Sequence, residues 1–183
     1  MPDATAADPR DDNDVRRVFL ALWPDEGMRG ALHHLAGMMD VGGRCVPRDH
    51  LHLTLAFPGT IKAAQAACLA ERLSSLRFDP IPILLDRLGY FPRAKVAWAG
   101  PSQPPEALGQ LAERARGLCL ACGIEIADRP FQPHVTLRRF ARPPSQVVLD
   151  EPLHWFADTL VLVESGRDGH PGPYRLLARW PSD

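Results

Sequence analysis

The chain has 183 residues, of which 45% are hydrophobic and 23% are charged, and its formal net charge at pH 7 is −1. This length and apolar content predict one globular domain with a substantial core. The near-zero charge excludes a strongly acidic or basic partner-binding tail, and no apolar run approaches the length needed to cross a bilayer.

Residues 1–14 are rich in Asp, Ala and Pro, so we expect a disordered leader without the apolar segment of a secretory signal. An apolar run at 18–23 then predicts a strand. Pro24 and the acids after it predict a helix that ends at Gly42. The next strand is expected to stop at Pro58, and Thr60 is expected to cap a helix that reaches about Arg77.

The second half of the chain predicts more strands than helices. Strands are expected at residues 81–88, 95–99, 124–126, 130–140, 159–164 and 174–180, and a helix between Ser102 and Gly123. The turn between the first two of these strands is too short for a parallel crossover. We therefore expect an α+β fold with mainly antiparallel sheet rather than a doubly wound one.

Four cysteines show no spacing that would close a zinc site. Cys119 and Cys122 form a Cys-x-x-Cys pair, which can indicate redox chemistry, but both fall on the apolar stripe of the expected helix. Buried thiols are the simpler interpretation. Because the sequence also has no secretory signal and no run that could cross a bilayer, we expect a soluble, cytoplasmic protein with reduced cysteines and no membrane association. We also expect a monomer.

Two short segments share one pattern, Leu51-His52-Leu53-Thr54-Leu55 and Pro133-His134-Val135-Thr136-Leu137. Side chains alternate along a strand, so the His and Thr of each copy share one face and the apolar residues share the other. One copy alone is typical of a half-buried strand with an incidental His. Two copies favour a functional site to which each segment contributes an imidazole and a hydroxyl.

This pair resembles the two His-x-Thr motifs of the 2H phosphoesterase superfamily, and within it the RNA 2′,3′-cyclic phosphodiesterases, formerly called 2′-5′ RNA ligases. The likeness covers about residues 16–181 and includes Phe19-Leu20-Ala21-Leu22-Trp23-Pro24, Thr54-Leu55-Ala56-Phe57 with Gly59, Val96-Ala97-Trp98, Phe131-Gln132 before the second motif, and Tyr174 before Trp180. The resemblance implies one domain over residues 15–183, built as two pseudo-symmetric lobes of antiparallel sheet with outer helices around a central cleft.

Two imidazoles that face one cleft are suited to paired acid and base catalysis, because His titrates near neutral pH. In-line phosphoryl transfer needs these groups on opposite sides of the phosphorus, and hydroxyls such as those of Thr54 and Thr136 can donate to the non-bridging oxygens. The resemblance implies that His134 activates water and that His52 protonates the departing O3′, which leaves a 2′-phosphate. It also implies a weak reverse ligation. We expect no metal or cofactor, because the two imidazoles and the two hydroxyls supply the acid, the base and the stabilisation of charge.

Three further positions, Arg139, Phe57 and His50, have more than one interpretation. The resemblance implies that Arg139 contacts the phosphate, but counting from His134 places Arg138 on the motif face, so Arg139 needs a bulge or a strand end to reach it. Phe57 matches the family's aromatic residue near the terminal base, where stacking tolerates any base, and a core position is the alternative.

Position 50 departs from the family, which more often has Asn or another polar residue there. Counting along the strand places His50 on the face of His52, and His-x-His can hold zinc, although no carboxylate cluster accompanies it. Other open alternatives are a phosphodiesterase for another small cyclic phosphate or for 2′-5′ linked oligonucleotides, and a non-catalytic module that binds RNA ends. A serine hydrolase is disfavoured because the sequence has no Gly-x-Ser-x-Gly elbow.

Overall fold

The computed structural model describes residues 14–166 and 172–181. Its elements are β1 (Val15–Leu22), α1 (Glu26–Met38), β2 (Arg44–Cys45), the 3₁₀ turn η1 (Arg48–His50), β3 (Leu53–Lys62), α2 (Ala63–Ser74), β4 (Ile81–Phe91), β5 (Val96–Gly100), α3 (Glu106–Ala121), β6 (Val135–Arg139), β7 (Val148–Ala157), β8 (Leu160–Ser165) and β9 (Arg175–Trp180). Of the residues expected to form a disordered leader, 1–13 lie outside this description. Asp14 is described, and its carbonyl accepts a hydrogen bond from the Ala63 amide at 2.9 Å.

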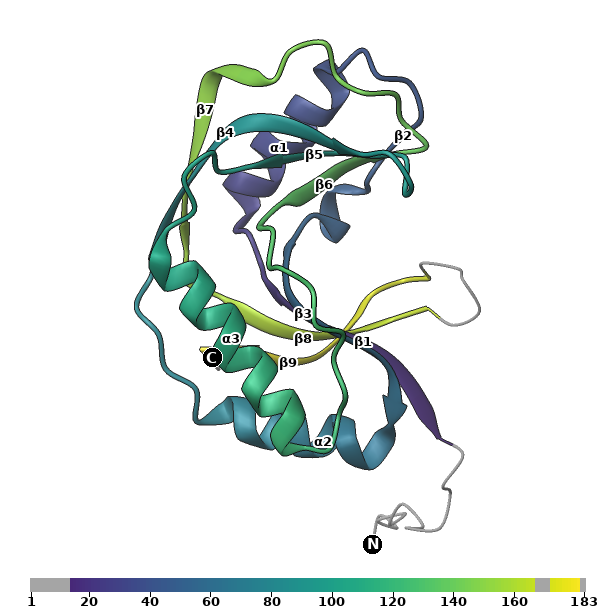
Figure 1. The fold of residues 1–183 in the computed structure, drawn as a ribbon, viewed down its shortest axis with the longest axis vertical. Coiled ribbons are helices and arrows are strands. Elements are labelled where there is room, and N and C mark those ends of the chain that lie inside the picture. Colours follow the sequence, from purple (N-terminus) through teal and green to yellow (C-terminus); the bar gives the residue numbers. More distant parts are fainter. Residues whose placement is uncertain (1–13, 167–171, 182–183) are drawn as a thin grey trace, which may run out of the picture.

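In the described part of the chain all strand pairs are antiparallel, and the nine strands form one sheet in the order β7-β4-β5-β6-β3-β1-β8-β9, with β2 beside β6. The predicted α+β antiparallel fold is therefore confirmed. The sheet has two halves, β7-β4-β5-β6 and β3-β1-β8-β9, joined between β6 and β3 by the single residue pair Leu53 and Val135. Figure 1 shows how the sheet curves so that the two halves face each other.

Helices cover both halves from outside. α1 contacts β2, β6 and β7, whereas α2 and α3 pack together beneath the half that contains β1, β3 and β9 (Figure 1). Each helix turns an apolar stripe inward, with Leu32 and Ala36 on α1, Leu69 and Leu73 on α2, and Leu108 and Leu111 on α3 all buried. These side chains join one hydrophobic cluster that continues through both halves of the sheet.

Local signals explain where α1 begins. The Asp25 carboxylate accepts a hydrogen bond from the Met28 amide at 2.7 Å, and Glu26 lies in the first turn. α2 begins later than expected because Thr60 remains in β3, and the Gln65 side chain caps the helix by accepting from the Lys62 amide at 3.0 Å. The predicted cap at Thr60 was therefore wrong, while the helix itself is confirmed.

One further prediction is wrong, and one strand was missed. Residues 124–126 form no strand, although Ile124 is buried against the core. β7 was not predicted at all. It is an edge strand that contains Pro152 and pairs with β4 through a register shift next to Leu85, so its buried positions do not alternate regularly. The expected turn-rich connection at residues 166–173 lies largely outside the described residues.

The prediction of reduced cysteines is also contradicted. Cys68 on α2 forms a disulfide with Cys122, which lies just after α3, and their Cα atoms are 6.0 Å apart. Cys122 is therefore not a free helical thiol, whereas Cys119 is a buried one, as predicted. Burial raises the pKa of the Cys119 thiol to about 12. Sequence spacing missed this disulfide because its partners are 54 residues apart. No helix in the described ranges is long and apolar enough to span a membrane.

Candidate active site

The two motifs meet where the halves of the sheet join. His52 directly precedes β3 and His134 directly precedes β6. The residues predicted to anchor them, Leu53, Leu55, Val135 and Leu137, are buried, and the His and Thr residues of both motifs are partly exposed on the other face. The predicted division between a polar and an apolar face is therefore confirmed.

The register at this junction makes the arrangement crosswise. Leu53 pairs with Val135 in antiparallel orientation, so extending the register by one residue in each direction places His52 across from Thr136 and Thr54 across from His134. Each half thus contributes a His that lies beside the Thr of the other half. The sequence could not predict this, because it does not specify which residues of the two motifs are paired.

The same backbone hydrogen bond orients both imidazoles. Nδ1 of His52 donates to the carbonyl oxygen of His50 at 2.7 Å, and Nδ1 of His134 donates to that of Gln132 at 2.7 Å. Because a carbonyl only accepts, Nδ1 carries the hydrogen in each ring and Nε2 is left as the reactive nitrogen. A neutral Nε2 can accept a proton and a protonated one can donate it.

Different aromatic rings surround the two imidazoles. Phe19 on β1 stacks on His52 with ring centroids 4.6 Å apart, and Tyr174 meets the same imidazole edge-on at 5.7 Å. Phe91 meets His134 edge-on at 4.9 Å, and Trp98 is tilted against it at 6.0 Å. These rings restrict both imidazoles and exclude water from one side of each.

A pocket of about 310 Å³ opens beside the first motif. Its walls come from both halves and consist of Arg44, Cys45, Val46, Pro47, His50, His52, Thr136, Arg139 and Tyr174. The structure therefore brings the predicted residues His52, Thr136 and Arg139 to one cavity. Thr54 and His134 are not among the residues that line it.

Burial lowers the pKa of His52 to about 4. Its hydrogen bond to the His50 carbonyl raises that pKa. The positive charge of Arg139 lowers it again, and so do His134 and His50 when they are protonated. Burial also lowers the pKa of His134, against the raising effect of its bond to Gln132. Both imidazoles are therefore neutral at pH 7 before an anion binds.

A bulge places Arg139 in the pocket, as the sequence required. On β5, Ala97 pairs with Arg138 and Trp98 pairs with Thr136, so Leu137 is the extra residue on β6. The bulge turns Arg139 to the side of Thr136. Arg138 points away, and its guanidinium donates to the carbonyls of Ala36, Met39 and Gly43 at 3.0, 3.1 and 3.3 Å. Arg138 therefore caps the C-terminal end of α1.

Phe57 is not a core residue. It is 46% exposed, and the Arg17 guanidinium lies 5.1 Å from its ring centroid. A register shift between β1 and β3, at Phe19, includes Phe57 and explains why counting from His52 does not predict its direction. The exposed ring is compatible with stacking on a base.

His50 lies in η1 rather than on a strand, so the strand-based count that grouped it with His52 was wrong, although both line the pocket. Its ring stacks on Tyr174 with centroids 4.0 Å apart. Burial lowers the pKa of His50, and the negative charge of Asp49 partly raises it again. Among the described residues, no group of three His, Cys, Asp or Glu is placed to hold a metal.

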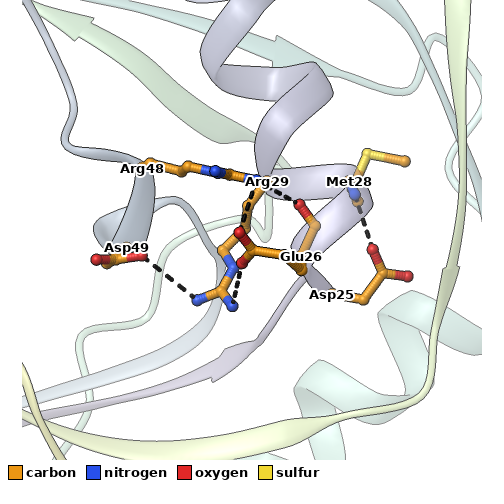
Figure 2. A network of polar contacts seen from close by, with 6 residues as sticks. All are labelled: Asp25, Glu26, Met28, Arg29, Arg48 and Asp49. Atoms are coloured by element: carbon orange, nitrogen blue, oxygen red, sulfur yellow. Dashed lines mark hydrogen bonds and ion pairs between the residues drawn. The ribbon is translucent and has the colours of Figure 1, made fainter.

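Ion pairs anchor the turn that leads into the first motif, as Figure 2 shows. Arg48 donates to the Glu26 carbonyl at 3.1 Å and pairs with its carboxylate at 2.7 Å. Arg29 pairs with the same carboxylate at 3.1 Å and reaches Asp49 at 3.9 Å. The start of α1 thus holds η1, whose last carbonyl orients His52. The sequence did not predict this network, because its partners are about 20 residues apart and separated by a helix.

Comparisons with known proteins agree with the geometry. The sequence profile of the 2′-5′ RNA ligase superfamily matches residues 26–169. An RNA 2′,3′-cyclic phosphodiesterase of Escherichia coli is 40% identical over 131 residues, which are 70% of this chain and 74% of the relative. An RNA 2′,3′-cyclic phosphodiesterase of Archaeoglobus fulgidus is 30% identical over 138 residues, which are 72% of this chain and 76% of the relative.

Solved structures show the same architecture. The crystal structure of E. coli LigT complexed with 3′-AMP superposes with a TM-score of 0.76 at 30% identity, over 91% of this chain and 98% of the other. The crystal structure of TT0787 of Thermus thermophilus superposes with a TM-score of 0.70 at 30% identity, over 89% of this chain and 96% of the other. The likeness therefore extends over both halves of the sheet.

Proposed function

This chain belongs to the 2′-5′ RNA ligase superfamily, and we propose on that premise that it is an enzyme that hydrolyses RNA 2′,3′-cyclic phosphate ends. The observation that carries this proposal is the crosswise placement of His52 beside Thr136 and of Thr54 beside His134. A phosphate between them has an imidazole on each side and a hydroxyl next to each imidazole. The relatives named RNA 2′,3′-cyclic phosphodiesterases support the choice of substrate.

In the reaction that we propose, Nε2 of His134 takes a proton from water, and the water oxygen attacks the phosphorus. The bond from phosphorus to O3′ breaks on the opposite side, and O3′ takes a proton from Nε2 of His52. The products are a 2′-phosphate and a free 3′-hydroxyl. The imidazoles have then exchanged protonation states, and solvent returns the proton from His134 to His52.

Thr54, Thr136 and Arg139 serve as donors to the non-bridging oxygens, which carry the charge of the transition state. Arg139 also has an electrostatic role, because its charge lowers the pKa of His52 in the free protein. A bound phosphate anion offsets that charge and favours the protonated form of His52. Substrate binding therefore supplies the acid that the reaction requires. Phe57 stacks on the terminal base without selecting its identity.

We infer that the enzyme uses neither metal nor cofactor, acts as a monomer in the cytoplasm where RNA ends occur, and catalyses the weak reverse reaction that forms a 2′-5′ bond. The site residues support a reaction without metal or cofactor, because their side chains can supply the acid, the base and the stabilisation of charge. Support for ligation comes only from the superfamily.

The decisive experiment incubates the purified protein with an oligonucleotide that ends in a 2′,3′-cyclic phosphate, in the presence of a chelator. We expect turnover and a 2′-phosphate product. Activity that the chelator abolishes and zinc or manganese restores would replace this mechanism with a metal-dependent one that uses His50. Binding without turnover would identify a non-catalytic module. Turnover only of 2′-5′ linked oligonucleotides or of other cyclic phosphates would reassign the substrate.

A substrate with sulfur as the 3′ leaving atom tests the two roles, since sulfur departs with little protonation. It should restore the rate of His52→Ala and leave His134→Ala slow. Restoration of the His134 variant instead would reverse the assignment. A 3′-phosphate product from the natural substrate would show that the cyclic ester binds in the opposite orientation.

A further inference from the structure

Arg44 shares the pocket with His52, Thr136 and Arg139, yet the proposed reaction gives it no role. It lies on β2 directly opposite Arg139 on β6, in antiparallel register. Two like charges placed opposite each other destabilise a sheet unless an anion lies between or beside them. None of the ion pairs or side-chain hydrogen bonds of the described residues engages either guanidinium.

The backbone around this pair is built to bring the two strands together. Gly43 has φ +70°, and a Cβ at this position would lie 2.2 Å from the carbonyl oxygen of Arg139. Only glycine permits such an approach. The Gly43 carbonyl also accepts from Arg138 at 3.3 Å. The position of Arg44 is thus fixed from its N-terminal side and from the facing strand.

An aromatic ring, rather than a carboxylate, supports the side chain. The Arg44 guanidinium lies 4.9 Å from the ring centroid of Phe140. Phe140 has φ +56°, a conformation that a bulky residue seldom adopts, and its ring is 62% exposed. A guanidinium on a ring keeps its charge and its N–H donors available, whereas one paired with a carboxylate does not. Arg44 is therefore free to bind an anion.

The position of the pocket indicates which anion Arg44 binds. The cavity is lined by His52 and not by His134. In the proposed reaction His52 protonates the departing O3′, so the ribose and the rest of the RNA lie on this side of the phosphorus. Arg44 lines the same cavity from β2, opposite Arg139 on β6. The group that follows the cyclic phosphate in this direction is the 5′ phosphodiester of the terminal nucleotide.

We propose that Arg44, supported by Phe140, binds the phosphodiester that joins the terminal nucleotide to the rest of the RNA. This inference rests on the proposed function and makes Arg44 a specificity-determining residue that favours RNA ends over free nucleoside cyclic phosphates. A charged donor directed at one phosphate gives affinity without reading sequence.

The test compares kcat/KM for a nucleoside 2′,3′-cyclic phosphate with kcat/KM for a dinucleotide that ends in the same cyclic phosphate. We expect the wild-type protein to prefer the dinucleotide by more than about tenfold, and Arg44→Gln to reduce that preference by about tenfold, as for loss of a charged hydrogen bond. Arg44→Lys should retain part of it. Phe140→Asn tolerates the left-handed backbone, removes the ring and should reduce the preference partly.

Arg142→Gln is the matched control, because it removes a charge from the same region but its side chain is 74% exposed, 3.9 Å from Asp40 and outside the pocket. It should leave the preference unchanged. The salt dependence gives a second measure, since kcat/KM for the dinucleotide should fall less steeply with ionic strength in Arg44→Gln, because one attraction between opposite charges is lost.

Three results separate this inference from the proposed function. A wild-type protein inactive on both substrates refutes the proposed function itself. Activity on both with no preference, or a preference that Arg44→Gln leaves intact, refutes only the role of Arg44. Equal losses on both substrates would place Arg44 on the reacting phosphate and overturn the inference as stated.

Discussion

Within the candidate site, the two imidazoles share a hydrogen-bond pattern but differ in their surroundings. His52 stacks flat on Phe19, whereas His134 meets only ring edges and tilted rings. The flat stack removes more water from His52, which agrees with its pKa of about 4. Aromatic packing thus sets how readily each imidazole takes up a proton.

Replacement of the imidazoles should reveal that they act together. His52→Ala and His134→Ala should each reduce kcat by about 10²-fold or more, the scale of a positioned acid or base. The double variant should lose much less than the product of the two effects, because both groups serve one transition state. Steady-state kinetics measures this, with circular dichroism to show that the variants are folded. Near wild-type turnover in either single variant would remove that residue from the mechanism.

The pH dependence should reflect the lowered pKa values. The active form needs one protonated and one neutral imidazole, but burial lowers both pKa values below the ordinary 6.5. Above these values the singly protonated form of the free enzyme decreases, so kcat/KM should peak below pH 6.5 and fall as the pH rises. The peak of kcat should lie at higher pH, because bound phosphate raises the pKa values. A kcat/KM profile centred above pH 6.5 would contradict this account.

At the residue scale, the sequence predicted which residues gather but not all of their neighbours. Alternation along a strand was enough to place His52, Thr54, His134 and Thr136 on one face. The sequence also indicated that Arg139 needs a bulge or a strand end to reach the motif face. It did not reveal Arg44, because β2 has only two residues and no periodic pattern.

At the scale of elements, Arg138 connects the second motif to α1. The last turn of α1 has no basic residue of its own, so the Arg138 guanidinium supplies the positive charge and the donors that the terminal carbonyls need. The same residue ends the bulge that directs Arg139. One side chain therefore stabilises a helix end and a site residue at once.

Arg138→Met should show both effects. Loss of the donors leaves the carbonyls of Ala36, Met39 and Gly43 without this partner and should lower the free energy of unfolding by about 1–3 kcal/mol. The Arg139 side chain should also be held less firmly toward the phosphate, so KM should rise more than kcat falls. Denaturant unfolding and steady-state kinetics measure the two effects, with Arg142→Met as the exposed control. A variant with lower stability but unchanged KM would limit Arg138 to helix capping.

Register shifts explain which elements the sequence could not predict. The helices have continuous apolar stripes, and all three were predicted. β7 lacks such a pattern because the shift beside Leu85 interrupts the alternation, and Pro152 is unusual in a strand. β3 continues through Pro58 and Gly59, which were expected to end it, since it pairs there with β1 through another shift. Such irregularities depend on the partner strand and are not encoded locally.

At the scale of the whole molecule, one hydrophobic cluster extends through both halves of the sheet, with helices outside. We propose from this that residues 15–183 unfold as a single unit, although the halves share only one strand pair at the junction. The antiparallel class was predictable from short connections. The strand order was not, because neighbours such as β3 and β6 are distant in the sequence.

The disulfide should contribute measurably to stability. It closes a loop between residues 54 positions apart, for which the chain-entropy model gives an upper value of about 4 kcal/mol. Reductant should therefore lower the Tm of the oxidised wild-type protein but not that of Cys68→Ser. Thermal denaturation with and without dithiothreitol measures this. Free Cys68 and Cys122 in the protein isolated under alkylating conditions would show that the bond does not form in the cell.

The crosswise junction has a consequence for regiochemistry. A two-fold axis through the Leu53 and Val135 pair would exchange the two histidines and the two threonines, so the reacting groups alone do not distinguish one bridging oxygen of the ester from the other. The distinction must come from parts that this axis does not repeat, namely the pocket beside His52 and the stacked Phe19. Which hydroxyl the hydrolysis releases is thus decided by residues that take no part in the proton transfers.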